Sequence, residues 1–139
     1  MKSKLNKILL IDDSEADNYI HSRVIKKADV TNEIVVKLGA QEALDYLQTK
    51  ENGEYPNPDL IFLDINMPGL NGWDFLEEYK KLDKEQKKGV VVCMLSTSAP
   101  DIERQNITKY EEIKSYSQKP LTNEALKHII REVYPEKVK

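Results

Sequence analysis

Short apolar runs alternate with stretches of helical periodicity along the chain. The strand-like runs lie at residues 7–11, 33–37, 60–63, 90–95 and 115–119, of which the last is the most polar, and each has the length of one strand. Apolar residues at helical spacing predict helices after Ser14, over 41–49, over 73–82, over 101–110 and after Thr122. Five strand–helix units with short connections predict a mostly parallel sheet with helices on both faces.

The composition of the runs indicates where each strand lies in the sheet. Residues 90–95 are apolar throughout, which is typical of an interior strand of a parallel sheet, whereas residues 115–119 are polar enough for an edge. Residues 50–58 contain Gly, Pro and polar side chains and are interpreted as a loop. The charge-rich stretch 80–88 is interpreted as the solvated end of a helix.

Polar side chains follow the strands at the point where each strand ends. Asp12 and Asp13 follow the first, Asp64 ends the third, Ser96 follows the fourth and Lys119 follows the fifth. Ligands of open α/β sheets bind outside the carboxyl ends of the strands. We therefore expect these side chains to share one rim of the sheet.

Three carboxylates on one rim have a definite chemical consequence. They repel one another, so one of them would retain its proton unless a cation lies between them. Carboxylate oxygens and water are the ligands that Mg²⁺ prefers, and Lys119 would add a second positive charge. A carboxylate can act as a nucleophile toward phosphorus, and phosphoryl transfer needs an in-line nucleophile and cations on the phosphoryl oxygens. The pattern is typical of a phosphoryl-accepting site.

Four segments resemble the receiver domains of response regulators in two-component signalling. They are Ile-Asp-Asp at 11–13, Leu-Asp-Ile-Asn-Met-Pro-Gly-Leu-Asn-Gly at 63–72, Leu-Ser-Thr at 95–97 and Tyr-Ser-Gln-Lys-Pro at 116–120. The resemblance covers nearly the whole chain, and all four segments occur in order, each at a strand end. It implies a flavodoxin-like, doubly wound α/β fold with a five-stranded parallel sheet of order 2-1-3-4-5. It also implies a single receiver domain over 1–139, with a core of about 6–134 and no output domain.

The resemblance implies that the chain is a phosphoacceptor that catalyses only its own phosphorylation and dephosphorylation. Asp64 would accept the phosphoryl group from a histidine kinase or a histidine phosphotransfer protein. Mg²⁺, for which Mn²⁺ can substitute, would be held by Asp12, Asp13, Asp64 and the backbone carbonyl of Asn66. The downstream target would be another protein, which the sequence does not identify.

The resemblance also implies the residues that respond to phosphorylation. Lys119 would contact the phosphoryl oxygens, and Pro120 would follow a cis peptide bond that directs Lys119 inward. Ser96 would be the switch hydroxyl and Tyr116 the switch aromatic. Where many relatives have Ala or Gly after the switch hydroxyl, this chain has Thr97, whose larger side chain would narrow access to the site.

The charge balance and the cysteine content limit the classes of protein that remain. A net charge of -3 lacks the basic footprint of a nucleic-acid-binding protein. No apolar run approaches the roughly 20 residues of a membrane span. Cys93 is the single cysteine, so no internal disulfide can form, which favours a reducing cytoplasm. The expectation is a cytoplasmic monomer or a weak dimer that depends on phosphorylation.

Three other functions use related features. A haloacid-dehalogenase-type phosphatase also uses an aspartyl nucleophile with Mg²⁺, but that family has a second Asp where this chain has Asn66. A flavodoxin-like electron carrier needs a phosphate-binding loop after its first strand, where Asp12 and Asp13 would repel the flavin phosphate. A pseudo-receiver would bind partners without phosphorylation, and Thr97 is the feature that motivates this alternative.

Overall fold

The structure is a computed structural model that describes residues 4–65, 67, 69–96, 110 and 113–135. Its centre is a parallel sheet whose strand order is β2-β1-β3-β4-β5, which confirms the order 2-1-3-4-5. The strands are β1 (Leu5–Ile11), β2 (Thr31–Lys37), β3 (Leu60–Asp64), β4 (Val91–Ser96) and β5 (Ile113–Gln118).

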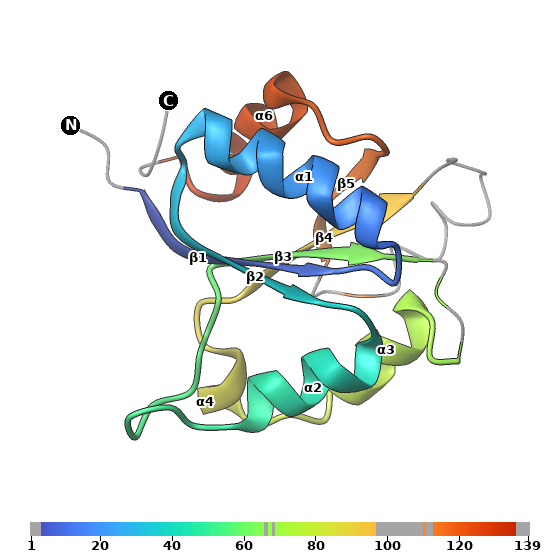
Figure 1. Ribbon diagram of the computed structural model, residues 1–139. Coiled ribbons are helices and arrows are strands. Elements are labelled where there is room, and N and C mark those ends of the chain that lie inside the picture. The colour runs from blue at the N-terminus through green and yellow to red at the C-terminus, as the bar shows by residue number, and fades with distance from the viewer. Residues whose placement is uncertain (1–3, 66, 68, 97–109, 111–112, 136–139) are drawn as a thin grey trace.

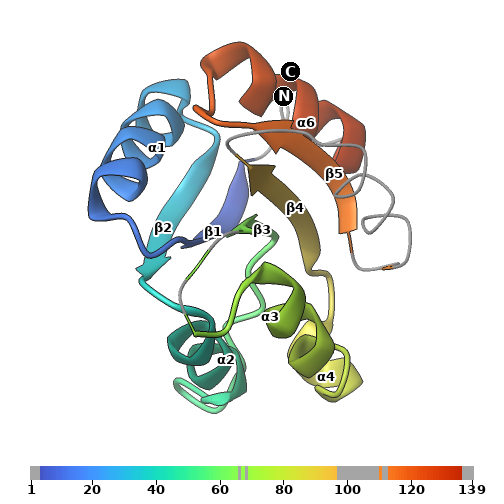
Figure 2. The ribbon, with the colours of Figure 1, turned by 90° about the vertical axis from the view of Figure 1, so that its right-hand side faces the viewer.

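Helices cover both faces of this sheet, as expected (Figure 1). One face carries α1 (Glu15–Ala28) and α6 (Asn123–Val133), and the other carries α2 (Ala40–Gln48), α3 (Gly72–Tyr79) and the short α4 (Lys84–Lys87). Figure 2 shows the same two layers after a quarter turn. Each face has its own apolar core, one between the sheet and α2 and α3, the other between the sheet and α1 and α6.

The apolar content of each strand agrees with its place in the sheet. β3 is buried along its whole length, and Val92 to Ser96 of β4 are buried as well, because both strands have neighbours on either side and helices on either face. β5 lies at one edge and is partly exposed, which confirms the prediction from its polar side chains. β2 forms the other edge and has no fully buried residue.

Local hydrogen bonds fix where the helices begin. The hydroxyl of Ser14 accepts a hydrogen bond from the backbone N–H of Asp17, and the hydroxyl of Thr122 accepts one from Ala125. Such side chains satisfy N–H groups that have no partner within the first turn of a helix. Asn71 accepts from the backbone of Asp74 at the start of α3, in a reciprocal capping box.

The structure of the charge-rich stretch 80–88 differs from the predicted end of a single helix. The helix α3 ends at Tyr79, and a separate short helix follows at Lys84–Lys87. The second helix begins where Asp83 takes an extended conformation and its N–H donates to the side chain of Gln86. The predicted helix over 101–110 lies outside the described residues, apart from Tyr110, which is not helical.

Candidate functional site

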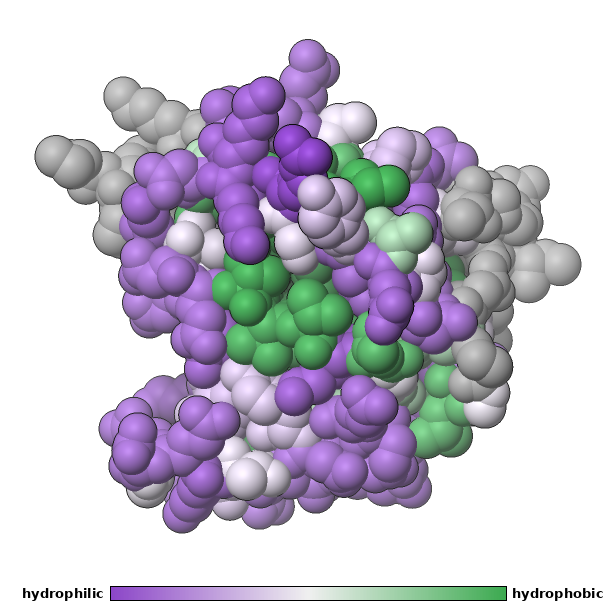
Figure 3. All heavy atoms as spheres, in the orientation of Figure 1, coloured by the Kyte–Doolittle hydropathy of each residue, from purple (hydrophilic) through white to green (hydrophobic). Residues whose placement is uncertain are grey.

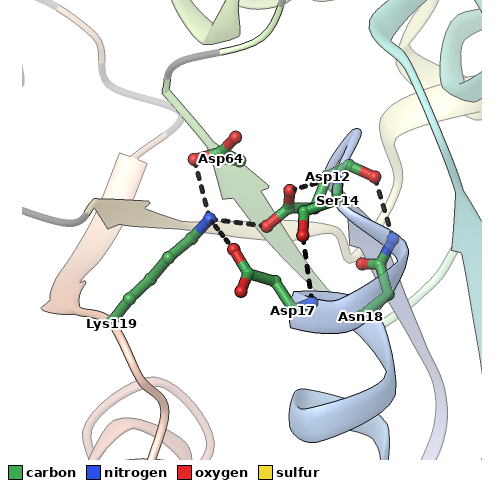
Figure 4. Close-up of polar contacts among 6 residues, drawn as sticks. All are labelled: Asp12, Ser14, Asp17, Asn18, Asp64 and Lys119. Carbon is green, nitrogen blue, oxygen red and sulfur yellow. Dashed lines mark hydrogen bonds and ion pairs between the residues drawn. The ribbon is translucent and has the colours of Figure 1, made fainter.

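The carboxyl ends of β1, β3 and β5 meet at one rim of the sheet (Figure 4). Lys119 lies just beyond β5, and its ammonium group is surrounded there by the carboxylates of three aspartates. Its Nζ is 2.7 Å from Asp12 Oδ2 and 3.1 Å from Asp64 Oδ1, so it joins the ends of three strands. The same Nζ is 2.9 Å from Asp17 Oδ2 in the first turn of α1.

The orientation of Asp12 is set by the start of α1. Its Oδ1 accepts a hydrogen bond from the backbone N–H of Ser14 at 2.9 Å, which leaves Oδ2 for Lys119. The side-chain Nδ2 of Asn18 donates to the backbone carbonyl of Asp12 at 2.8 Å. The β1–α1 connection therefore holds a buried carboxylate in a fixed position before any ligand arrives.

Three carboxylates form a cluster that fits a divalent cation. Asp12, Asp13 and Asp64 each offer an oxygen, and these oxygens lie within 4.8 Å of one another. Asp12 and Asp64 are buried, whereas Asp13 is exposed, so a cation could reach the cluster from solvent. An all-oxygen set with an open side suits Mg²⁺, which retains several of its waters.

Burial and, to a smaller extent, the negative charge of Asp12 raise the pKa of Asp64 from its ordinary value of 3.8 to about 6, and Lys119 offsets only part of this rise. For Lys119, burial by itself lowers the pKa, but the hydrogen bonds that its ammonium donates to Asp12 and Asp17 outweigh burial and raise the pKa above its ordinary value. The rim therefore carries an excess of negative charge next to one firmly protonated ammonium group. A further cation would relieve this excess.

The raised pKa of Asp64 predicts that the metal-free protein loses stability as the pH rises. The unfolded carboxyl loses its proton near pH 3.8, whereas the folded one keeps it up to about pH 6. Since the folded state binds the proton more tightly, the free energy of unfolding falls across this window, by about 2 kcal/mol after allowance for solvent at the rim. In urea titrations with a chelator, we expect the stability advantage of Asp64→Asn over wild type to grow by that amount from about pH 4 to about pH 7. An advantage that does not change with pH would contradict the raised pKa.

Two side chains at this rim were not anticipated from the sequence. Asp17 was not among the predicted site residues, yet its carboxylate accepts a hydrogen bond from the ammonium of Lys119. Asn18 is buried, and its Oδ1 has no hydrogen-bond partner among the described residues. A possible signal was their position, since the first turn of a helix that follows β1 faces the same rim as the strand ends.

The two predicted switch residues lie on β4 and β5. Ser96 is fully buried at the end of β4, one residue beyond Leu95, which pairs with Asp64 across the sheet. Tyr116 is partly buried and packs against the core below α2 and α3. The predicted ligand Asn66 and the neighbouring Thr97 lie outside the described residues.

The backbone around Lys119 ties β5 to β4. The N–H of Lys119 donates to the carbonyl of Ser96 at 2.7 Å. The peptide bond between Lys119 and Pro120 is cis, as the resemblance implied. The side chain of Lys119 points from this connection toward Asp64 (Figure 4).

Gly72 allows the start of α3 to lie directly against the end of β3. Its N–H donates to the carbonyl of Ile65 at 2.9 Å. A Cβ at this position would come within 2.8 Å of the backbone oxygen of Asp64 and 2.9 Å of the Cα of Ile65. Neither backbone atom can move without shifting the strand end that carries Asp64.

Gly72→Ala is therefore expected to lower the free energy of unfolding by about 1 to 3 kcal/mol through this overlap. Gly39→Ala is the matched control, because an added Cβ at Gly39 meets nothing within 4 Å. Urea unfolding of the two variants gives the comparison. Equal losses in both variants would contradict the importance of the close approach at Gly72.

Comparisons with known proteins agree with this geometry. The model of the response regulator receiver domain family matches residues 8–131. The chain is 31% identical over 126 residues to the probable methanogenesis regulatory protein FilR2 of Methanothrix harundinacea strain 6Ac, covering 91% of this chain and 79% of the relative. It is 34% identical over 107 residues to the response regulator Rcp1 of Synechocystis sp., covering 75% and 69%.

A solved structure of similar shape is a two-component response regulator from Cytophaga hutchinsonii. The match has a TM-score of 0.84 and 30% sequence identity, and it covers 96% of this chain and 99% of the other.

The helices of the described part of this chain were also compared with the requirements of a membrane span. Each of them is too short or too polar to cross a bilayer.

Proposed function

Because the chain belongs to the response regulator receiver domain family, we propose that Asp64 accepts a phosphoryl group in two-component signalling. The observation that carries this proposal is the position of the Lys119 ammonium, 3.1 Å from Asp64 Oδ1 and beside the acidic cluster. The family match favours this function over a dehalogenase-type phosphatase or a flavodoxin-like carrier. The proposed donors are a histidine kinase or a histidine phosphotransfer protein, and the proposed setting is the cytoplasm.

The proposed reaction is a displacement at phosphorus. An oxygen of the Asp64 carboxylate forms a bond to phosphorus, and the bond between phosphorus and the donor's imidazole nitrogen breaks. The bonding electrons stay with that nitrogen, which leaves as an imidazole and needs no proton from this chain if its other nitrogen is already protonated. Asp64 must be ionised to attack, so the chain has to offset part of the rise in pKa that burial causes.

Lys119 supplies part of that offset. Its ammonium group already lies between Asp64 and Asp12, and its raised pKa keeps it charged. When a phosphoryl group arrives at Asp64, the same ammonium can donate hydrogen bonds to the new oxygens without a change of its position. A positive group held in place before reaction stabilises charge as it develops and needs no reorganisation.

We propose that Asp12, Asp13 and Asp64 hold Mg²⁺, with the backbone carbonyl of Asn66 as a further ligand. A bound Mg²⁺ would neutralise charge on the phosphoryl oxygens and on the carboxylates that surround them. The burial of Asp12 and Asp64 and the 4.8 Å spread of their oxygens support this assignment. Asp13 faces solvent and is the ligand that can be changed with the least effect on folding.

The proposed Mg²⁺ site predicts that Asp13→Asn binds Mg²⁺ more weakly than the wild-type protein does. Since one of three charged ligands becomes neutral, we expect the affinity for Mg²⁺ to fall by about tenfold or more. Glu15→Gln is the control, because Glu15 is exposed two residues away and outside the cluster. Calorimetric titration of Mg²⁺ into each protein tests the point, and equal affinities in the two variants would contradict the role of Asp13.

The proposed response to phosphorylation involves Ser96 and Tyr116. The hydroxyl of Ser96 would move toward the phosphoryl oxygens, since charge-assisted hydrogen bonds are stronger than neutral ones. Tyr116 would then turn into the space beside β4. The burial of Ser96 at the end of β4 and the partial burial of Tyr116 on the neighbouring strand support this proposal. The resulting surface change would be read by a protein target.

Incubation with acetyl phosphate and Mg²⁺, followed by intact mass spectrometry, tests the proposed function. We expect one added phosphoryl group per chain, and none when a chelator replaces Mg²⁺. A protein that gains no phosphoryl mass under these conditions would contradict the proposal. That outcome would favour a pseudo-receiver that binds partners without phosphorylation.

A further inference from the structure

The outer edge of β2 has few of the features that usually prevent pairing between strands. Thr31–Lys37 spans seven residues without proline, and its register against β1 is continuous from Glu33 to Lys37. Within the part of the chain that the structure describes, no strand pairs with β2 on its other side. Proteins usually protect such an edge with short strands, prolines, bulges or charged side chains, and of these β2 has only the charges of Glu33 and Lys37.

Apolar side chains gather at this edge. Among the described residues, five large hydrophobic side chains are well exposed, and four of them lie on α1, on β2 or just after β2: Tyr19, Ile20, Val36 and Leu38. Figure 3 shows an apolar patch over β2, between the helices α1 and α2. Exposed apolar side chains that gather in one place, with polar residues around them, are typical of an interaction surface.

Hydrogen bonds show which backbone groups face outward. The carbonyl of Lys37 accepts a hydrogen bond from the N–H of Asp12, so Lys37 turns toward β1. In a parallel pair, alternate residues turn both backbone groups to the same neighbour. Ile34 and Val36 therefore present their N–H and C=O groups at the outer edge.

We propose that β2 is the contact strand of a homodimer, in which two copies pair their β2 strands antiparallel about Val35. The two sheets then form one continuous sheet across a twofold axis. Ile34 of each copy lies opposite Val36 of the other, and both residues have outward backbone groups for the ladder. On the α1 face, Tyr19 lines one hollow with Val36 and Leu38 and so lies beside the pairing edge.

Charge complementarity selects this register and a second copy as the partner. Pairing about Val35 places Glu33 of each copy directly opposite Lys37 of the other, because the two residues lie two positions either side of Val35. Side chains that lie directly opposite each other must point to the same face of the sheet. The twofold axis must therefore pass through a residue of β2, and the nearest alternative registers are centred on Ile34 or Val36. Centring on Ile34 or Val36 removes both Glu–Lys pairs. Opposite charges across a strand pair are stabilising, and like charges are destabilising.

Both charged side chains are available for this contact. The side chain of Glu33 is 59% exposed, and its ion pair with Lys7 is long, at 3.9 Å. Lys37 is partly exposed, and its ammonium lies 5.0 Å from the centre of the Tyr46 ring. The pairing involves no residue of the phosphoryl site, so it is independent of the phosphorylation of Asp64.

Sedimentation equilibrium of the full chain over a range of concentrations tests the dimer. We expect Glu33→Lys and Lys37→Glu each to weaken association by about tenfold or more, because each replaces two attractive pairs with two repulsive ones. The double variant E33K/K37E restores the opposite pairs and should recover association. Glu132→Lys, which makes the same change of charge on an exposed position of α6, should associate as wild type does.

Amide hydrogen exchange provides a second measurement at the level of the backbone. The N–H groups of Ile34 and Val36 should gain protection as the wild-type concentration rises, but not in Glu33→Lys. Asp64→Asn should associate as wild type does, which separates this contact from a dimer that depends on phosphorylation. A wild-type chain that stays monomeric at millimolar concentration would overturn the proposal. A dimer that is insensitive to both single variants, or that is not recovered in the double variant, would also overturn it.

Discussion

Asp64→Asn is expected to lose nearly all phosphorylation while keeping its fold. The amide has almost the same shape as the carboxylate, so the packing at the end of β3 should not change, but it lacks the anionic oxygen that attacks phosphorus. The rate of phosphoryl gain from acetyl phosphate should fall by on the order of 10³-fold or more, to the level of uncatalysed transfer. Intact mass spectrometry over time measures the change.

The control for this prediction is Asp45→Asn, the same substitution on an exposed position of α2. The side chain of Asp45 accepts a hydrogen bond from Gln41 on the same helix and lies outside the acidic cluster. It should accept the phosphoryl group at the wild-type rate. If Asp64→Asn still gains one phosphoryl group at that rate, the acceptor is another residue and the assignment to Asp64 is wrong.

Lys119→Met is expected to lower the free energy of unfolding of the metal-free protein by about 3 kcal/mol at neutral pH. Its Nζ contacts three carboxylates, and two of these belong to the buried residues Asp12 and Asp64. Methionine keeps most of the length of the side chain but leaves the carboxylates without an ammonium partner. The loss should be smaller below about pH 6, where Asp64 can hold a proton, and Mg²⁺ should recover part of it.

Lys81→Met provides the comparison for the ion pairs of Lys119. Lys81 Nζ lies 2.8 Å from Glu78 Oε2, about as close as Lys119 lies to Asp12, but both partners are exposed. An exposed pair contributes at most about 1 kcal/mol, so this variant should differ little from wild type in urea unfolding. Similar losses in the two variants would show that the buried position of Lys119 adds nothing to stability.

Lys119→Met should also slow phosphorylation in the presence of Mg²⁺, because the ammonium beside Asp64 Oδ1 is absent. A variant that is destabilised but phosphorylated at the wild-type rate would separate the two roles. It would leave Lys119 as a stabilising residue only.

Much of the fold could be predicted because the sheet is parallel and buried. Continuous apolar runs such as Leu60–Leu63 can be satisfied only inside such a sheet, and each run ends where a charged or hydroxyl side chain begins. The ends of helices were less predictable. The stretch 80–88 favours a helix by composition, but the extended backbone at Asp83 divides it, and the N–H of Asp83 donates to the buried side chain of Gln86 there.

By itself, the sequence determined which chemical groups stand at the ends of the strands. An aspartate that ends an apolar run lies at the rim in any parallel sheet, because the direction of the chain is the same in every strand. This is why Asp12, Asp64 and Lys119 could be assigned to one rim before their distances were known.

Only the tertiary structure decided how those groups share their charges. The ammonium of Lys119 also binds Asp17, and Ser14 takes one oxygen of Asp12, through contacts between α1 and the strand ends. The structure also showed that the edge of β2 presents apolar side chains beside Glu33 and Lys37. Distances across the fold and the exclusion of water set these interactions, and both arise from packing between segments that lie far apart in the chain.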